Sequence, residues 1–473
     1  MKAFIKTYGC QMNEQDSLQM GGILSRLGYG KTEDPLQADF ILFVTCSIRE
    51  KSVHKVYSEL GKLKPYIENN PQLVVGLSGC VAQQEKGNLF KRFPYLDLVF
   101  GPDAISSLPS MLEEVRLKKG SLFPAHLMNT RLHTRKDFDF VNLVAEDENR
   151  VRAFVNIQKG CDNVCAFCIV PYVRGREVSR PSDEILREVS MLVDMGVREV
   201  TLLGQNVNSY GIKDTDELKF SGLLEKIATQ TKIERLRFTT SHPKDVGDDL
   251  IEKFASLPNL CPHFHLPVQS GSTKILEAMG RQYTRGQYLE IVSKLKKVRP
   301  GISLTTDIIV GFPGETEDDF KQTLSLVEEA GFDLSYSFVY SPRPYTSAIK
   351  LGDDISTEEK NRRLNLLLEK QRQVSRENNI RFLGTRQEVL VETWDVLGQA
   401  WMGRTPTNKI VHFKTNDLSL IKNADHLIGN LRQVVINHTN PHSLLGELDH
   451  GTYQNEGNGA DHRPVYQHAH HHS

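Results

Sequence analysis

The stretch "KGCDNVCAFCIVP" (residues 159–171) gathers three cysteines, Cys161, Cys165 and Cys168, in the spacing C-x3-C-x2-C. No fourth cysteine and no histidine nearby completes the set. Three thiolates can hold zinc or an iron-sulfur cluster, but structural zinc sites are closed by four protein ligands, usually in two pairs. Electron-transfer [4Fe-4S] clusters likewise use four cysteines. We therefore expect a cluster in which one iron stays open to an outside ligand, and this open iron is the functional feature.

The composition is that of an ordinary soluble protein with more than one domain. The chain has 473 residues, of which 39% are hydrophobic and 25% charged, so about two to four domains are expected. The formal net charge is −1, so binding of nucleic acid would depend on local basic patches. The opening "MKAFIKTYGCQMNE" has neither the build of a signal peptide nor a long apolar span. These features favour a cytoplasmic protein without a membrane segment.

Six of the seven cysteines form two triples, and Cys261, which belongs to neither, is expected to be a buried thiol. The second triple is widely spaced: Cys10, Cys46 and Cys80. In a cytosolic chain such cysteines are more often metal ligands or catalytic groups than disulfide partners.

Residues 1–118 alternate apolar runs with helical segments, which predicts a Rossmann-like parallel sheet with crossover helices. The runs are "AFIKTYG", "DFILFVTC", "LVVGLSGC" and "DLVFGP". Cys10, Cys46 and Cys80 each follow one run, and the carboxyl ends of parallel strands share one edge of a sheet. We therefore expect the three to converge there. They could instead be unrelated buried thiols, but their polar or glycine-flanked turns favour a ligand role.

Residues 119–150 lack periodicity and are interpreted as a linker. From 151 to 383, six strand candidates alternate with helices: "RAFVNIQ", "EVTLLGQ", "RLRFTT", "HFHLPVQ", "SLTTDIIVGF" and "LSYSFVYS". Six units without a seventh or eighth predict a partial TIM-type (β/α)6 barrel, closed by a long amphipathic helix over 357–383. Short alternating strands over 384–448 predict a small all-β barrel, and 449–473 is a polar stretch expected to be a disordered tail or an engineered remnant. The fold class is α/β.

The C-x3-C-x2-C motif on a loop after the first barrel strand resembles the radical S-adenosylmethionine superfamily. The resemblance implies that Cys161, Cys165 and Cys168 are catalytic and hold a [4Fe-4S] cluster whose open iron chelates S-adenosylmethionine. One electron then cleaves the sulfonium to methionine and a 5′-deoxyadenosyl radical. This radical abstracts a hydrogen that no side-chain base could remove, so the cofactor carries the hard chemistry.

The resemblance extends over nearly the whole chain, to about residue 448, and is to the methylthiotransferases of that superfamily. It is carried by "YGCQMNEQDS", "TCSIREKS", "SGCVAQQE", "GCDNVCAFCIVPYVRGREVSRP", "LLGQNVNSYG", "RFTTSHP", "HLPVQSGS" and "DIIVGFPGETEDDF". The resemblance implies that Cys10, Cys46 and Cys80 hold a second, auxiliary [4Fe-4S] cluster, also with an open iron. That cluster would hold or donate sulfur, which one S-adenosylmethionine methylates while a second one yields the radical.

"QMNE" and "SIRE" resemble the branch that acts on isopentenylated adenosine in tRNA. This implies methylthiolation at carbon 2 of N6-isopentenyladenosine at position 37, next to the anticodon. Alternatives are methylthiolation of threonylcarbamoyladenosine or of a ribosomal-protein aspartate, and a non-catalytic iron-sulfur RNA-binding protein. The implied partners are the tRNA anticodon stem-loop, a reductant such as flavodoxin or ferredoxin, and iron-sulfur or sulfur carrier proteins. A monomer is expected.

Four polar residues at strand ends are further candidates. The superfamily binds the methionine amino group where Gln205 and Asn206 stand, and Gln269 and Asp307 could contact the ribose. Alternatively, these side chains satisfy backbone groups where loops begin. The segment "GFPGET" lacks the lysine of a phosphate-binding Walker loop, so that function is rejected.

The C-terminal barrel resembles the TRAM domain, an RNA-binding module, through "GRTPTNKIVHFK". Arg404, Lys409 and Lys414 are the predicted phosphate contacts. Nearby aromatic residues could stack on unpaired bases, as single-stranded RNA requires: Trp401, His412 and Phe413. The alternative is that Trp401 and Phe413 belong to the core of an ordinary barrel.

Overall fold

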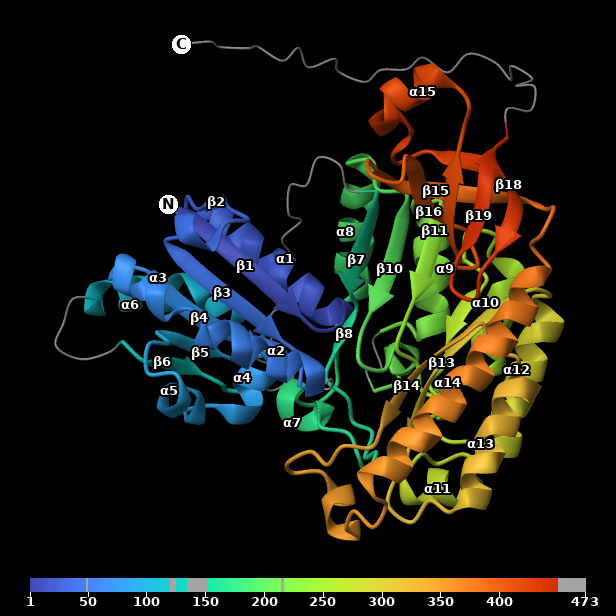
Figure 1. Ribbon diagram of the computed structural model, residues 1–473, viewed down its shortest axis with the longest axis horizontal. Helices are drawn as coiled ribbons and strands as arrows, with labels where there is room; N and C mark the ends of the chain where they lie inside the picture. Colours follow the sequence, from blue (N-terminus) through green and yellow to red (C-terminus); the bar gives the residue numbers. More distant parts are fainter. Residues whose placement is uncertain (48–49, 120–124, 134–150, 214–216, 450–473) are drawn as a thin grey trace.

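The computed structural model describes residues 1–47, 50–119, 125–133, 151–213 and 217–449, which form three units. In Figure 1 the N-terminal domain (blue) lies beside the central barrel (green to yellow). The C-terminal β-barrel (red) caps one end of the central barrel. Helix α7 (Val170–Arg174) lies where the N-terminal domain meets the central barrel. The cysteine loop that precedes α7 is therefore at a domain boundary.

The N-terminal domain is a parallel sheet covered by helices on both faces. Its strand order is β2-β1-β3-β4-β5-β6. The strands are β1 (Lys2–Tyr8), β2 (Gly30–Lys31), β3 (Phe40–Thr45), β4 (Val74–Gly79), β5 (Leu98–Phe100) and β6 (Leu127–Asn129). The helices are α1 (Gln11–Arg26), α2 (Glu50–Gly61), α3 (Lys64–Asn69), α4 (Cys80–Glu85), α5 (Asn88–Arg92) and α6 (Leu108–Lys118). This confirms the predicted Rossmann-like sheet.

Strand β3 packs against helices on both faces, which explains why its sequence is apolar throughout. Phe40, Leu42 and Val44 pack with α1 and α6 in one core, while Ile41 and Phe43 pack with α2 in another. A parallel strand buried on both faces reads as a continuous apolar run.

The predicted linker over 119–150 begins later than expected. Strand β6 lies inside that range and pairs in parallel with β5, and Gln83 Nε2 donates to the Thr130 carbonyl at 2.8 Å. The N-terminal domain therefore continues past residue 118. A three-residue edge strand is too short to show the alternation that sequence patterns detect. Residues 120–124 and 134–150 of the predicted linker lie outside the described residues.

The central barrel is an open arc of six parallel strands, as predicted. Its two three-stranded sheets, β11-β10-β7 and β12-β13-β14, are joined by a parallel bridge between Leu236 and Leu260. The strands are β7 (Arg152–Asn156), β10 (Glu199–Leu203), β11 (Arg235–Phe238), β12 (His263–His265), β13 (Ser303–Val310) and β14 (Leu334–Val339). The outer helices are α8 (Ser182–Asp194), α9 (Phe220–Gln230), α10 (Asp248–Ser256), α11 (Thr273–Ala278), α12 (Arg285–Val298), α13 (Glu317–Ala330) and α14 (Thr357–Ile380).

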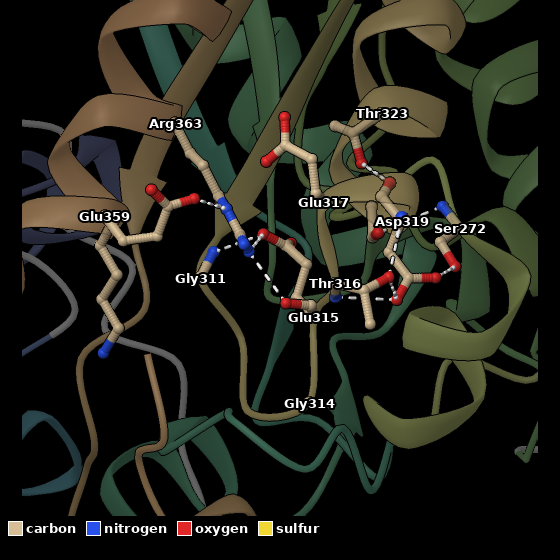
Figure 2. Close-up of polar contacts among 12 residues, drawn as sticks. Ser272, Gly311, Gly314, Glu315, Thr316, Glu317, Asp319, Thr323, Glu359 and Arg363 are labelled. Atoms are coloured by element: carbon tan, nitrogen blue, oxygen red, sulfur yellow. Dashed lines mark hydrogen bonds and ion pairs between the residues drawn. The ribbon is translucent and has the colours of Figure 1, made fainter. Parts of the chain in front are cut away.

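The segment "GFPGET" (residues 311–316) is a structural junction (Figure 2). The Gly311 N–H donates to Glu315 Oε1 at 2.9 Å, and Arg363 of α14 donates to the same oxygen at 2.7 Å. Thr316 and Asp319 cap each other at the start of α13. The segment thus ties α14 to the barrel and begins α13.

The C-terminal unit is a closed barrel with strand order β15-β16-β17-β19-β18. Its elements are β15 (Arg386–Asp395), β16 (Ala400–Arg404), β17 (Ile410–Lys414), α15 (Leu418–Lys422), β18 (Leu431–Thr439) and β19 (Leu444–Leu448). Trp401 and Phe413 are buried in its core, and Trp401 Nε1 donates to the Ala424 carbonyl at 2.9 Å. The prediction that these two rings stack on RNA bases was therefore wrong, and the alternative holds for them.

Throughout the part of the chain that the structure describes, no helix combines the length and apolarity needed to cross a bilayer. The predicted tail over 449–473 lies outside the described residues, apart from Asp449.

Candidate active site

The barrel cysteine loop, residues 160–169, is fixed against the N-terminal domain by a buried ion pair on each side. Before the loop, Lys159 in β8 (Gln158–Lys159) pairs with Asp103. After the loop, Arg174 at the end of α7 pairs with Asp16 of α1 at 2.6 Å. Separating the two domains would break both buried pairs and leave each charge without its partner, which is unfavourable. The two pairs therefore favour one arrangement of the domains. The loop is thus positioned by the domain interface as well as by its own strand.

The backbone of this loop is folded tightly around its cysteines. Gly160 has φ +71°, and a Cβ there would lie 2.6 Å from the Gly175 carbonyl oxygen, so only glycine fits. The Cys161 N–H donates to that same carbonyl at 3.2 Å, and the Cys168 N–H donates to the Cys165 carbonyl at 3.0 Å. These bonds keep the three sulfurs on one short turn.

Burial governs the protonation of two of these thiols. It raises the pKa of Cys161 to about 11 and the pKa of Cys168 to about 12. Thiols of this kind stay protonated at neutral pH unless a metal replaces the proton, and binding of metal releases protons. The loop is therefore a donor set that a cluster would bring to the thiolate form.

The second triple converges at one edge of the N-terminal sheet, following strands β1, β3 and β4: Cys10, Cys46 and Cys80. The register pairs Tyr8 with Thr45 and Thr45 with Gly79, so the three strands end side by side. Gly79 has φ +95°, and a Cβ there would lie 2.8 Å from Thr45 N. The convergence expected from the strand ends is present in the fold.

Arg174 also faces this auxiliary triple. The pKa of Cys10 is lowered to about 6, mainly by a hydrogen bond with the Cys46 thiol and also by the Arg174 guanidinium, although burial acts in the opposite direction. Burial raises the pKa of Cys80, which forms a hydrogen bond with Arg174. The arginine that ends α7 therefore supplies positive charge to cysteines of another domain.

Both triples fit a multi-iron cluster better than a single ion. Structural zinc sites are closed by four protein ligands, and each triple offers three cysteines. An iron-sulfur cubane spreads its thiolates over separate irons and uses cysteine sulfur as ligand, which is the donor set present here.

One cavity of about 720 Å³ joins the three units. Its wall includes residues from the auxiliary triple, the central barrel and the C-terminal barrel: Cys10, Cys46, Cys80, Gln205, Asp307, Tyr336, Arg404, Asn408 and Lys409. The sulfur-bearing edge of the sheet and the predicted RNA-binding domain thus open into the same space.

Gln205 links this cavity to the barrel cysteines. Its Oε1 accepts the N–H of Gly160, next to Cys161, and this contact fixes the orientation of the amide. Its Nε2 is buried and has no hydrogen-bond partner among the described residues. Asn206 lies elsewhere: it is 2% exposed, donates to Asp245 at 2.7 Å, and is not part of the cavity wall.

Of the other two predicted residues, Gln269 and Asp307, again only one lines the cavity. Gln269 has φ +74° and is buried, and its backbone bonds the carbonyl of Asp307 and the N–H of Ile309, outside the cavity wall. Asp307 lines the cavity, with its Oδ2 3.6 Å from His265 Nε2. Of the four polar candidates, Gln205 and Asp307 face the common space.

The three predicted RNA contacts have different environments. Arg404 pairs with Glu392 at 3.1 Å, and Lys409, 9% exposed, pairs with Asp333 of the central barrel at 2.6 Å. Lys414 is exposed at the end of β17. Lys409 therefore joins two domains, and Lys414 is the lysine open to solvent.

Sequence reasoning missed two arginines of β11 that fasten the C-terminal barrel. Arg235 donates to the Arg404 carbonyl at 2.7 Å, and Arg237 donates to the Thr405 carbonyl at 2.9 Å. Arg237 also pairs with Glu199 at 2.8 Å. The available signal was "RLRF", in which arginines alternate within a strand of a buried sheet and so require buried partners.

Comparison with known proteins agrees with this architecture. The Radical SAM superfamily matches residues 155–327, and the family described as Uncharacterized protein family UPF0004 matches residues 2–101. A radical S-adenosylmethionine methyltransferase from Kitasatospora setae, solved with tryptophan substrate and a SAM analog, aligns with TM-score 0.53 at 12% identity. The alignment covers 83% of this chain and 79% of that one. This likeness concerns the fold alone.

Sequence relatives are much closer. A protein of Geobacter sulfurreducens is 46% identical over 447 residues, covering 94% of this chain and 97% of its own length. One of Geobacter metallireducens is 48% identical over 445 residues, covering 94% and 98%. Both are named tRNA-2-methylthio-N(6)-dimethylallyladenosine synthase. The chain belongs to this family of radical S-adenosylmethionine enzymes, which confirms the resemblance carried by its motifs.

Proposed function

We propose that this chain methylthiolates carbon 2 of N6-isopentenyladenosine at position 37 of tRNA. The observation that carries the proposal is the common cavity. Its wall contains the auxiliary triple, Gln205 beside the barrel triple, and loop residues of the C-terminal barrel. A reaction that joins a sulfur source, a hydrogen-abstracting radical and an RNA base needs all three within one enclosed space.

Two [4Fe-4S] clusters fit the two cysteine sets, with Cys161, Cys165 and Cys168 as the catalytic ligands and Cys10, Cys46 and Cys80 as the auxiliary ones. When bound, the clusters and S-adenosylmethionine supply the electron, the radical and the methylthio group. The protein contributes position: Gly160 and Gly79 shape the two turns, and the Arg174–Asp16 pair holds them in one arrangement.

Gln205 is the side chain best suited to S-adenosylmethionine. Because Oε1 is occupied by Gly160, the amide presents Nε2, a donor, to the ligand. A donor suits the carboxylate of the methionine half rather than its amino group. Asp307 offers an acceptor for a ribose hydroxyl in the same cavity. Asn206 and Gln269 would act through the backbone that they position.

The RNA would approach from the C-terminal barrel. Lys414 lies exposed for a phosphate, while Arg404 and Lys409 line the cavity. An adenine beside the anticodon is in a loop, so bringing it into the cavity costs less than extruding a base from a duplex. We further propose a cytoplasmic monomer that receives electrons from flavodoxin or ferredoxin and is served by an iron-sulfur or sulfur carrier.

The test is an anaerobic assay of the reconstituted protein with three anticodon stem-loops, carrying isopentenyladenosine, threonylcarbamoyladenosine or unmodified adenosine. Nucleosides are analysed by mass spectrometry after digestion. We expect the methylthio product from the isopentenylated RNA alone. Equal product from the threonylcarbamoylated RNA would contradict the substrate assignment, and absence of S-adenosylmethionine cleavage would contradict catalysis.

A further inference from the structure

The three barrel cysteines have different surroundings. The Cys165 sulfur receives a hydrogen bond from Arg281 Nη1 at 3.4 Å and lies 3.9 Å from His242 Nε2. Cys161 is bonded by Asn163 of its own loop, and Cys168 is bonded by the backbone of Val170. Cys165 is therefore the cysteine at which side chains from distant segments converge.

Arg281 is a buried cation, only 4% exposed, with a fixed orientation. Its Nη2 donates to the Pro267 carbonyl at 2.8 Å, and its Nε donates to the Tyr283 hydroxyl at 3.0 Å. Within the described ranges of the chain, no carboxylate pairs with Arg281, whereas buried arginines ordinarily have an anionic partner. Its Nη1 instead faces the Cys165 sulfur.

The backbone places Arg281 there. Helix α11 ends at Ala278, and the Ala166 N–H of the cysteine loop donates to the Met279 carbonyl at 2.8 Å. Gly280 has φ +71°, and a Cβ there would lie 3.1 Å from the Val164 carbonyl oxygen. The chain that carries Arg281 is thus packed directly on the loop that carries Cys165.

His242 adds a neutral donor. Its Nδ1 accepts the N–H of Lys244 at 3.2 Å, so the ring proton lies on Nε2, the atom that faces Cys165. Asn208 bonds both the N–H and the carbonyl of His242, at 2.9 Å each. Because Nδ1 acts as an acceptor, the ring carries one proton and is neutral. The imidazole is therefore held in place with its proton toward the sulfur.

We propose that Arg281, assisted by His242, is a positioning residue that raises the reduction potential of the barrel cluster through Cys165. This inference rests on the proposed role of the barrel triple as cluster ligands. A reduced cluster carries one more negative charge than an oxidised one, so a fixed cation and a donor at a ligand sulfur stabilise the reduced form more. The reaction needs an electron from an outside reductant, so this potential decides how readily the electron is accepted.

The experiment is an anaerobic redox titration of the full-length, two-cluster protein, followed by electron paramagnetic resonance. Addition of S-adenosylmethionine identifies the barrel signal by changing it. We expect Arg281→Met to shift the reduction equilibrium of the barrel cluster about tenfold toward the oxidised form, about 59 mV for one electron. Arg281→Lys should lie between this variant and the wild type. His242→Phe should shift the equilibrium in the same direction by less.

Arg285→Met is the matched control. Arg285 also donates to two backbone carbonyls, those of Gly271 and Gln322, but its ion pair is with Glu329 and it bonds no cysteine. Its loss should leave both potentials unchanged. The auxiliary cluster is an internal control in every sample, because its potential should not respond to Arg281→Met.

An unchanged barrel potential in Arg281→Met would overturn the proposal. If Arg281→Met loses its barrel iron, the barrel-cluster potentials of Arg281→Lys and His242→Phe test the proposal instead. Lowered potentials in both support the proposal, and wild-type potentials in both overturn it. Failure of the proposed function has a different signature, namely wild-type protein with both clusters that makes no methylthiolated RNA while the potentials still differ among variants.

Discussion

The two cysteine triples achieve similar donor sets in opposite ways. The barrel triple lies on one loop, so its geometry is set by a few turn residues, foremost Gly160. The auxiliary triple is assembled by sheet register, which brings together residues 36 and 34 positions apart in sequence. A site on one loop depends on the conformation of that loop, whereas a site assembled from several strands depends on the folding of the whole domain. Arg174 connects the two, since it ends the helix after the barrel loop and forms a hydrogen bond with Cys80 of the auxiliary triple.

The largest expected effect comes from removing the barrel triple. Cys161, Cys165 and Cys168 replaced together by alanine should abolish formation of 5′-deoxyadenosine, because no ligand set for the catalytic cluster remains. Iron should fall by about half, from about eight per chain if both clusters are cubanes. Chromatographic quantification of 5′-deoxyadenosine together with iron analysis provides the test. Persistent cleavage of S-adenosylmethionine would refute the assignment of this loop.

The reciprocal variant separates the two roles. With Cys10, Cys46 and Cys80 replaced by alanine, we expect reductive cleavage of S-adenosylmethionine to continue while methylthiolated RNA is lost. The reason is that these cysteines lie on the N-terminal sheet, apart from the barrel loop. Both products are measured in the same reaction. Normal yield of methylthiolated RNA would show that the sulfur does not come from this edge of the sheet.

The comparison also explains what could be predicted from sequence. The barrel triple was visible as a motif, and the auxiliary triple followed from strand ends once a parallel sheet was inferred. Gln205 and Asp307 line the cavity, and their role as ligands of S-adenosylmethionine stays a prediction, whereas Asn206 and Gln269 lie outside the cavity wall. Contacts between distant side chains gave no periodic signal, so the link from Arg281 to Cys165 was missed. The same holds for Lys409, whose partner Asp333 is on another domain.

Breaking the ion pair between Arg174 and Asp16 should lower the stability of the protein and impair the auxiliary site. Arg174→Met leaves the Asp16 carboxylate buried without its partner, which costs about 3–5 kcal/mol for a buried pair. We expect a lower midpoint in chemical unfolding and reduced iron at the auxiliary site, which also loses its nearby positive charge. The exposed pair between Lys31 and Glu33 is a control, because Lys31→Met should change stability by about 0–1 kcal/mol.

Glycine variants sharpen the contrast between a local and an assembled site. Gly79→Ala forces a side chain against Thr45 of the neighbouring strand, so auxiliary iron should fall while barrel iron is kept. Gly160→Ala should do the reverse, because its Cβ would meet the Gly175 carbonyl. The control is Gly28→Ala, which has φ +81° but nothing within 4 Å and should cost only about 1 kcal/mol of backbone strain. Mössbauer spectra of iron-reconstituted variants distinguish the outcomes. Equal loss from both sites in either cysteine-adjacent variant would mean that the two sites are not independent.

The smallest effect concerns RNA, which should bind without altering either triple. Removing the whole C-terminal barrel after Leu383 is a poor test, because Arg235 and Arg237 would lose the carbonyls that they bond and the cavity would lose part of its wall. A single exposed lysine avoids this problem. Lys414 lies at the end of β17 in solvent, whereas Lys409 is held by Asp333.

We therefore expect Lys414→Ala to weaken binding of the anticodon stem-loop modestly. It should also lower the log–log salt slope by roughly 0.7, the value for one phosphate contact on a single strand. Iron content and RNA-independent cleavage of S-adenosylmethionine should match wild type, since Lys414 contacts neither cysteine set. Lys409→Ala is the contrasting variant: it removes a cross-domain ion pair, so it should lower stability as well as affinity. The measurement is an anaerobic titration of labelled stem-loop at several salt concentrations with proteins of equal iron content. If Lys414→Ala retains the wild-type slope, the exposed face of β17 is not the phosphate contact. The basic helix α14 is then the next surface to test for phosphate contacts, again with variants that leave both clusters intact.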